Sequence, residues 1–293
     1  MTKLIHFITL AVLGVTQLVA AEKKIVLIAG GPSHGPGEHE FRAGCLLLES
    51  CLDKVSGINS VVYTNGWPQE ASAFDGADAI IIYSDGGGGH PAIQRDHLKV
   101  LGALMNKGIG LGCIHYAVEL PKDKGGPEFL QWIGGYFETY WSVNPHWVAD
   151  FTSFPNHPIT RGVKPFKIND EWYYHMRFPD SMQNVTPILT AIPPESTRGK
   201  PGANDPHGGN PEVQKHKGEP EHVMWAIQRP DGGRGFGFTG AHFHKNWAEE
   251  NFRKTVLNAT LWIAKMDVPP DGVQSSVTPQ QLTANLDAKG RQK

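Results

Sequence analysis

The chain has 293 residues, of which 40 % are aliphatic, aromatic or cysteine. This share is ordinary for a soluble globular protein that buries a substantial core. A formal net charge of −2 at pH 7, without a basic stripe, gives no basis for nucleic-acid binding. The length allows one large domain or two small ones.

Residues 1–21 have the pattern of a secretory signal peptide. Lys3 precedes an apolar stretch, residues 4–20, which ends in small residues and is followed by the charged residues 22–24. The alternative is a retained N-terminal anchor, which the short apolar run disfavours. We therefore expect an exported protein, periplasmic or extracellular, with no stable membrane span after cleavage.

The first half of the mature chain alternates between strands and helices. Short apolar runs that end in turn-rich segments predict strands at residues 24–29, 60–64, 79–84 and 109–114. Helices are expected after residues 38–40 and over residues 92–106, the second closed by Gly108 as a left-handed cap. This alternation predicts a parallel sheet with right-handed crossovers.

The second half is less regular. A short helix is expected at residues 127–133, and the final one at residues 246–264. Further strands are predicted at residues 146–151, 167–174, 186–192, 221–229 and 233–240. Residues 193–220 form a Gly/Pro-rich insertion that is either functional or disordered. We predict one α/β domain, residues 22–268, followed by a polar, frayed tail, residues 269–293.

The three cysteines do not predict a disulfide framework. Cys45 and Cys51 fall on one expected helix, about 9 Å apart along its axis, which is too far for a bridge. Cys113 lies inside the central strand. We expect all three to pack as small hydrophobes; an exported reactive thiol is the alternative.

Polar side chains follow several of the predicted strands. The loops after these strands carry His34, Asp85, His90, His115 with Tyr116, His242 and His244, while Glu171 lies near the edge of another strand. Because ligands bind outside the carboxyl ends of the strands in open α/β sheets, we expect these side chains to converge on one site. A lone loop histidine is more often structural, and only the convergence favours a site.

The alternate spacing of His242 and His244 would place both imidazoles on one face of a strand. Such a pair suits a divalent metal such as zinc, with a third ligand from His34, His115 or Glu171. The alternative is that His242 alone points inward and His244 faces solvent. No HExxH or CxxC spacing supports the metal.

Two other chemistries are disfavoured. The glycine run at residues 86–89 lacks the order of a phosphate-binding loop. At the end of the central strand His115 occupies the position of a nucleophile elbow, and Cys113 is buried two residues earlier, so a thiol-based amidotransferase or hydrolase is not expected. The aromatic residues between 132 and 147 are either sugar-stacking platforms or core.

Four segments together resemble the ThuA-like (trehalose utilisation) family. They are Gly112-Cys113-Ile114-His115-Tyr116-Ala117, Asn156-His157-Pro158-Ile159-Thr160, Asp170-Glu171-Trp172-Tyr173, and Gly240-Ala241-His242 with Trp247. The resemblance implies a flavodoxin-like three-layer sandwich with a mostly parallel central sheet, as in class I glutamine amidotransferase-like proteins. It also implies a site with His115, Glu171 and His242, loss of the cysteine nucleophile, and a link to sugars or keto-sugars. Cys113 for the usual glycine, the added His244 and the insertion depart from the family pattern.

We therefore predict an exported enzyme that acts on a small carbohydrate or keto-sugar derivative. His115 and Glu171 would be its acid/base pair, a role that requires pKa values tuned near the working pH. The substrate-binding residues would be His34, Asp85, His90, Tyr116 and His242. A non-catalytic carbohydrate-binding protein and a partner-binding domain are the alternatives.

Overall fold

The computed structural model describes residues 22–290, so the expected signal peptide lies outside the described residues. A seven-stranded sheet has the order β2-β1-β3-β4-β9-β8-β7, and a second sheet pairs β5 with β6. Strands β2, β1, β3, β4 and β9 run parallel, whereas β8 runs antiparallel to both of its neighbours, β9 and β7. The expected mostly parallel sheet is confirmed.

The strands are β1 (Lys23–Ala29), β2 (Ile58–Tyr63), β3 (Ala77–Tyr83), β4 (Gly110–Ile114), β5 (His146–Phe151), β6 (Phe166–Glu171), β7 (Val185–Ala191), β8 (Glu221–Gln228) and β9 (Arg234–Phe238). The helices are α1 (Phe41–Leu52), α2 (His97–Met105), α3 (Gly126–Trp132), α4 (Pro211–Lys215), α5 (Glu250–Ile263) and α6 (Pro279–Thr283). Among the described residues, no helix is both long and apolar enough to cross a membrane.

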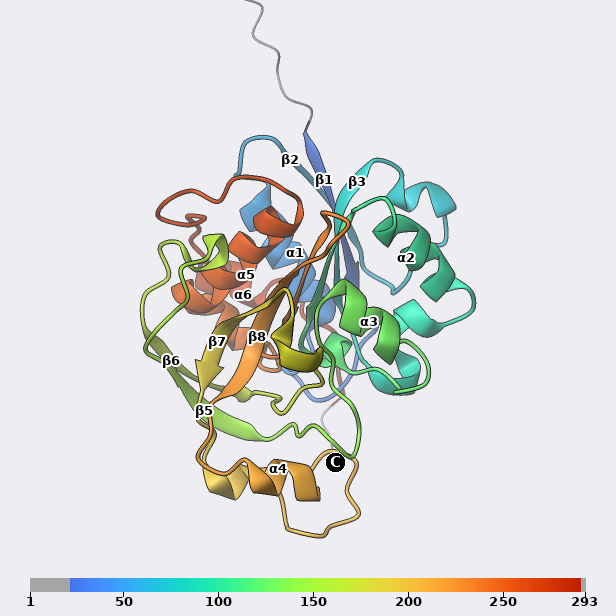
Figure 1. The fold of residues 1–293 in the computed structure, drawn as a ribbon. Coiled ribbons are helices and arrows are strands. Elements are labelled where there is room, and N and C mark those ends of the chain that lie inside the picture. The colour runs from blue at the N-terminus through green and yellow to red at the C-terminus, as the bar shows by residue number, and fades with distance from the viewer. Residues whose placement is uncertain (1–21, 291–293) are drawn as a thin grey trace, which may run out of the picture.

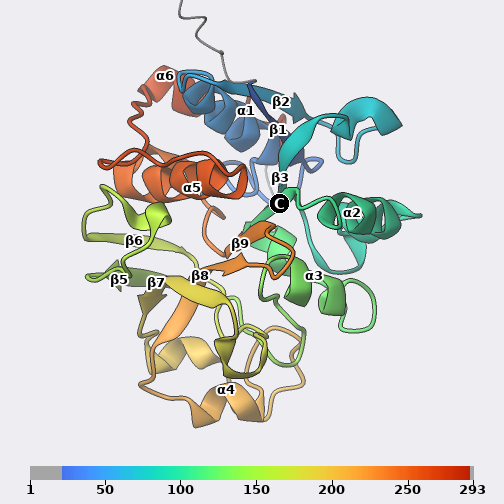
Figure 2. The same ribbon diagram turned by 45° about the horizontal axis from the view of Figure 1, so that its top comes forward.

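Helices cover both faces of the large sheet, which makes three layers. Helices α1 and α5 pack on one face and share a core with its inward residues, while α2 and α3 cover the other (Figure 1). The second sheet, β5 and β6, lies beside α5 (Figure 2). The expected three-layer α/β fold is confirmed.

Strand β4 lies in the middle of the parallel part of the sheet, and all five of its residues are buried. Its glycines permit this close packing. A Cβ on Gly110 would lie 2.3 Å from the Ile263 carbonyl oxygen of α5, and one on Gly112 would lie 2.4 Å from the Phe236 ring of β9. Continuous burial on both faces explains the apolar run that the sequence shows here.

Several elements are shorter than expected. The predicted helix over residues 92–106 begins only at His97, after a 3₁₀ turn at Pro91–Ile93 that the His90 side chain caps. The predicted helix from residue 246 splits into a 3₁₀ turn, His244–Ala248, and α5. Proline at the first position of the 3₁₀ turn allows the bend before α2, because its missing N–H is not needed there.

Two segments in which the sequence predicted no helix or strand each contain a short helix. The insertion contains α4, and its Arg198 is fully buried. The polar tail forms α6, which begins with a capping box between Thr278 and Gln281. The tail is therefore not frayed up to residue 290, because its polar groups bond to the domain. All three cysteines are buried and free, as expected.

Candidate functional site

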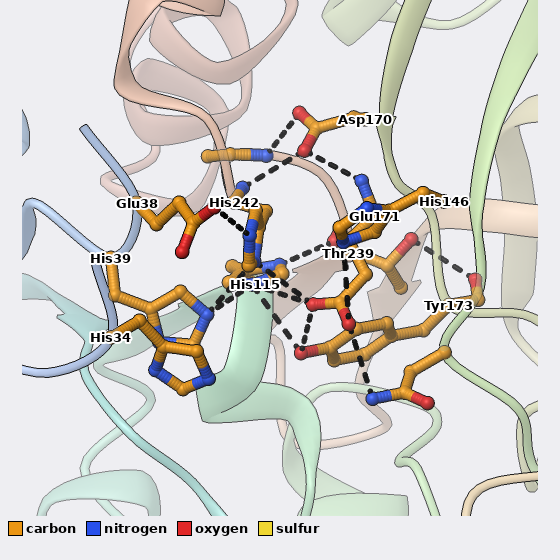
Figure 3. Close-up of polar contacts among 12 residues, drawn as sticks. His34, Glu38, His39, His115, His146, Asp170, Glu171, Tyr173, Thr239 and His242 are labelled. Atoms are coloured by element: carbon orange, nitrogen blue, oxygen red, sulfur yellow. Dashed lines mark hydrogen bonds and ion pairs between the residues drawn. The ribbon is translucent and has the colours of Figure 1, made fainter. Parts of the chain in front are cut away.

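Four side chains converge at the carboxyl edge of the sheet (Figure 3). His115 is the first residue after β4, His242 follows β9, Glu171 is the last residue of β6, and His39 precedes α1. We call His39, His115, Glu171 and His242 the histidine cluster. His39, His115 and His242 meet because the parallel strands β1, β4 and β9 end at the same edge. Glu171 reaches them from the antiparallel second sheet.

His115 lies at a sharp turn. Its φ is 57°, a left-handed conformation that non-glycine residues seldom adopt, and its side chain is fully buried. The expected elbow at this position is confirmed. Such local strain persists only where the surrounding structure over-determines it, and it gathers at functional sites.

The inward-facing atoms of the cluster are close together. His39 Nε2 lies 3.0 Å from His115 Nε2 and 3.1 Å from His242 Nδ1. Glu171 Oε2 lies 3.0 Å from His242 Nδ1 and 3.5 Å from His115 Nε2. All four atoms fall within 4.8 Å of one another, so one small cation would touch each of them.

The outward-facing nitrogens of two histidines fix their tautomers. His115 Nδ1 is 2.9 Å from the Thr239 carbonyl oxygen, which can only accept, so this nitrogen carries a proton. His39 Nδ1 is 3.0 Å from an oxygen of the Asp85 carboxylate, which places the proton there as well. The two Nε2 atoms that face each other are then both acceptors, and a positive species between them would relieve the repulsion of their lone pairs.

The charges of the cluster disfavour a proton as that species at His39. Burial and the neighbouring His115 lower the pKa of His39 far below its ordinary value of 6.5. Burial alone would raise the pKa of Glu171, but the adjacent imidazoles of His115 and His242 outweigh it and hold that pKa below 4.5. Burial opposes protonation of His242 too, yet Glu171 raises its pKa overall. The site therefore contains a carboxylate surrounded by imidazoles.

A buried aspartate holds the turn after β9. Asp170 accepts hydrogen bonds from the backbone N–H groups of Ala241, His242 and Phe243, and from the side chain of Asn246. This turn contains Ala241 at a φ of 84°. Asp170 thereby orients His242, which explains why an aspartate stands next to Glu171.

The rim of the cluster is polar and partly open. Glu171 Oε1 lies 3.3 Å from the Asn144 amide nitrogen and 3.7 Å from His146 Nε2, whose side chain is 48 % exposed. Tyr173 Oη donates to Glu171 Oε2 at 3.2 Å. The exposed His34 stacks on His39, with ring centroids 3.6 Å apart. A ligand from solvent would meet His34 and His146 first.

Most of the expected site residues come together. His115, Glu171 and His242 form the cluster, Asp85 and His34 contact His39, and the Tyr116 ring lies 5.9 Å from that of His39.

Two expected residues lie elsewhere. His90 is buried, and both of its ring nitrogens make hydrogen bonds to the backbone. Its Nε2 donates to the Ala117 carbonyl oxygen, and its Nδ1 accepts from the Ala92 N–H. It is a structural residue and not a substrate ligand. His244 is also not beside His242 at the cluster. The strand has ended and a 3₁₀ turn begins, so strand alternation fails, and its Nε2 donates to the Leu282 carbonyl instead.

The sequence reasoning missed His39, His146 and Tyr173. His39 lies in the loop after β1, and the same rule of strand ends that selected His34 applies to it. His146 and Tyr173 come from β5 and from the segment after β6, which belong to the small sheet and gave no such signal.

Comparison with known proteins agrees with this fold. The family described as "ThuA: Trehalose utilisation" matches residues 33–263. A putative ThuA-like protein from Bacteroides uniformis ATCC 8492 has a similar structure, with a TM-score of 0.59 and 15 % identity over 87 % of this chain and 96 % of that one. Another from Parabacteroides merdae ATCC 43184 gives a TM-score of 0.55 and 14 % identity over 85 % and 92 %. No curated protein matches the sequence.

Proposed function

The chain belongs to the ThuA (trehalose utilisation) family, whose fold is glutamine amidotransferase-like, and from this premise we propose that it is an enzyme acting on a carbohydrate or keto-sugar derivative. The histidine cluster would be its active site, and the chemistry would be proton transfer next to a sugar carbonyl. The observation that carries the proposal is the convergence of three imidazoles and a carboxylate on one point.

The cluster fits a divalent metal such as zinc. Zinc–nitrogen distances of about 2.0–2.1 Å place the ligands of a tetrahedral ion roughly 3.3 Å apart. Four of the distances between ligand atoms lie between 3.0 and 3.5 Å. Thr239 and Asp85 bind the outer nitrogens of two histidines, as outer-shell partners of metal ligands commonly do. His39, His115, His242 and Glu171 would hold the ion.

When bound, such an ion polarises a carbonyl oxygen. The chain's own residues would then handle the proton. Glu171 Oε1 faces the rim, where His146 Nε2 is 3.7 Å away and accessible to solvent. This geometry favours His146 as the group that moves the proton, with Glu171 orienting it, in place of the Glu171–His115 pair expected from sequence. The lowered pKa of Glu171 suits a ligand and not a proton carrier, and both nitrogens of His115 are already engaged within the cluster.

A small crevice at the sheet edge borders Asp85, which contacts His39 of the cluster. It measures about 210 Å³ and lies where the crossovers from β1 and β3 diverge, between Gly30, Gly31 and Pro32 on one side and Ser84 and Asp85 on the other. Such switch points are where open α/β sheets bind ligands. Because Asp85 contacts His39, a sugar in this crevice would lie next to the cluster.

A second candidate function, a non-catalytic carbohydrate-binding protein, is favoured by a different observation. A larger hollow of about 580 Å³ is lined by Trp67 and polar side chains, among them Asn65, Gln69 and Gln94. The Trp67 ring stacks flat on His97, with centroids 4.3 Å apart. An aromatic platform with a polar rim suits a sugar ring, and this hollow does not include the histidine cluster.

One experiment separates the two. The purified protein is incubated with trehalose and its oxidised keto derivatives, with and without chelator, and the products are followed by mass spectrometry. Turnover that chelator and Glu171→Gln abolish, and that Trp67→Ala retains, supports the enzyme. Sugar binding without product, lost in Trp67→Ala and unaffected by chelator, contradicts it and supports the binding protein.

We also propose that the protein is exported, on the basis of its N-terminal sequence pattern. N-terminal sequencing of the protein purified from its native cells tests this. A mature chain that begins near residue 21 or 22 agrees with export, whereas an intact Met1 contradicts it.

A further inference from the structure

The C-terminal residues 279–290, which we call the strap, run across the loop that carries His34 and His39. Helix α6 lies beside α1 (Figure 2). From there the Leu282 carbonyl accepts a hydrogen bond from His244, and the Asn285 carbonyl accepts one from Arg42 of α1. These contacts bring Asp287 and Lys289 to residues 34–40, which we call the histidine loop.

Lys289 is enclosed by oxygen atoms of the histidine loop. Its ammonium lies 3.3 Å from Glu40 Oε1 and donates to the carbonyls of Gly35, Glu38 and His39. Its side chain is only 4 % exposed, and that of Glu40 is 1 % exposed. A buried ion pair of this kind is costly to break, because the remaining charge has no solvent.

The histidine loop requires such support because its backbone is irregular. His34, Gly37 and His39 all have positive φ values, of 59°, 83° and 45°. Glu40 makes one hydrogen bond within the loop and one to the strap. Its Oε1 accepts from the Gly37 N–H, and its Oε2 accepts from the Asp287 N–H. Lys289 supplies the positive charge that pairs with the buried Glu40 carboxyl group.

The loop is connected directly to the cluster. The His39 N–H donates to the His242 carbonyl at 3.0 Å, and Glu38 Oε1 lies 3.7 Å from His242 Nε2. A displacement of the loop would therefore move both His39 Nε2 and the Glu38 carboxylate that lies next to His242 Nε2.

We propose that the strap holds the histidine loop in its ion-binding conformation, with Lys289 as the positioning residue that acts through Glu40. This inference deepens the proposed function and rests on it for its effect on ion affinity. Residues 34–40 and residues 279–290 would work as one unit, so that the end of the chain is part of the active-site scaffold.

The test measures two quantities on full-length chains. One is Zn²⁺ affinity by competition with a chromogenic chelator, and the other is amide hydrogen exchange of residues 34–42 without metal. The variants are Lys289→Met and the double variant Glu40→Gln/Lys289→Met, in which no charge is left unpaired. Lys99→Met, at an exposed position on α2, controls for the loss of a lysine charge.

Lys289→Met is expected to lower Zn²⁺ affinity on the order of 10- to 100-fold, the range typical of outer-shell partners, and to speed exchange of the loop. The double variant should recover part of both, because neither partner of the buried ion pair is then left alone. If Lys289→Met does not fold, the double variant is compared directly with the wild type, and faster loop exchange is still expected because the three carbonyls lose their donor.

Affinity within about twofold of wild type, well below the outer-shell range, together with unchanged loop exchange overturns the strap proposal. If the wild type itself binds no divalent ion, the proposed metal site fails separately. The strap is then judged by exchange alone, where faster exchange confined to residues 34–42 supports it and unchanged exchange overturns it.

Discussion

Two parts of this molecule place buried histidine beside glutamate, with different results. In the histidine cluster the ring nitrogens face one another across 3.0–3.1 Å and share Glu171. Beneath the insertion, His175 Nδ1 lies 3.5 Å from Glu221 Oε1 and Arg198 approaches the same oxygen at 3.8 Å. We call His175, Arg198 and Glu221 the insertion cluster.

The difference lies in where the remaining polar atoms point. In the histidine cluster the outer nitrogens of His39 and His115 bind Asp85 and Thr239, so the inner ones are free to act together. In the insertion cluster His175 Nε2 and Arg198 Nε are buried without a hydrogen-bond partner among the described residues. There the Arg198 guanidinium donates to the carbonyls of Val213 and His216 and so anchors the insertion. Proximity of histidine and glutamate does not make a site; convergence of their free atoms does.

The largest effect is expected from Glu171→Gln, which preserves shape and removes the charge. Turnover of a keto-sugar substrate should fall on the order of 10²- to 10⁴-fold, because His146, the proposed acid/base group, loses the carboxylate that orients it. Zn²⁺ affinity should fall as well, because one of the proposed ligands loses its charge. The matched change Glu221→Gln in the insertion cluster should leave both near wild type. Steady-state kinetics and chelator competition measure them. Equal losses in the two variants would remove the distinction between the clusters.

Arg198→Met should lower the stability of the fold and leave Zn²⁺ affinity unchanged, the reverse of what Glu171→Gln should do. Removing one partner of a buried charge pair costs about 3–5 kcal/mol in the free energy of unfolding, and Arg198 is fully buried. Urea denaturation should therefore show a large loss of stability. Zn²⁺ affinity of the folded fraction should not change. A folded Arg198→Met variant that binds no ion would mean that the insertion cluster contributes to the site.

Asp85→Asn tests whether Asp85 orients His39 in the histidine cluster. The carboxylate fixes the proton on His39 Nδ1, and an amide can present its own N–H there instead, which favours the wrong tautomer. Ion affinity should fall roughly 10- to 100-fold, the range measured for outer-shell carboxylates. Asp78→Asn is the control, because Asp78 pairs with Lys23 in a different ion pair. An affinity for Asp85→Asn equal to that of the control would contradict the orienting role.

Particular residues show what the sequence could and could not predict. The apolar run of β4 and the turn at His115 were visible because a strand buried on both faces must be apolar until it ends. His242 followed from the same rule, whereas Glu171, on the antiparallel strand β6, was indicated by a family motif. His244 was misplaced because the strand ends before it, and strand boundaries are not encoded in alternation alone.

The contacts that organise the site are long-range and gave little local signal. His39 and His242 are 203 residues apart, and Glu40 and Asp287 are 247 apart. Nothing in the polar tail indicated that Lys289 would be buried. Charges of this kind acquire their partners only when the chain has folded, so composition alone classified the tail as frayed.

The smallest effect concerns the link between the insertion and the site. His207 Nε2 lies 3.2 Å from Glu119 Oε2, and this hydrogen bond raises the pKa of His207 above 6.5. A raised pKa in the folded state means stability that is fully present below pH 6.5 and is lost as pH rises through the folded value. The neighbouring backbone continues the contact, since the Asn144 N–H donates to the His207 carbonyl and the Asn144 side chain donates to Glu171.

Residues 200–210 should therefore exchange amide hydrogens faster at about pH 8 than at pH 6 after correction for intrinsic rates, because neutral His207 loses its charge-assisted bond. The His207 side chain is 30 % exposed, which limits the change to below about 1 kcal/mol. Glu119→Gln should abolish the pH dependence while α4 remains folded. If the pH dependence survives in Glu119→Gln, another group titrates, and the insertion would be coupled to the histidine cluster by a route other than the His207–Glu119 pair.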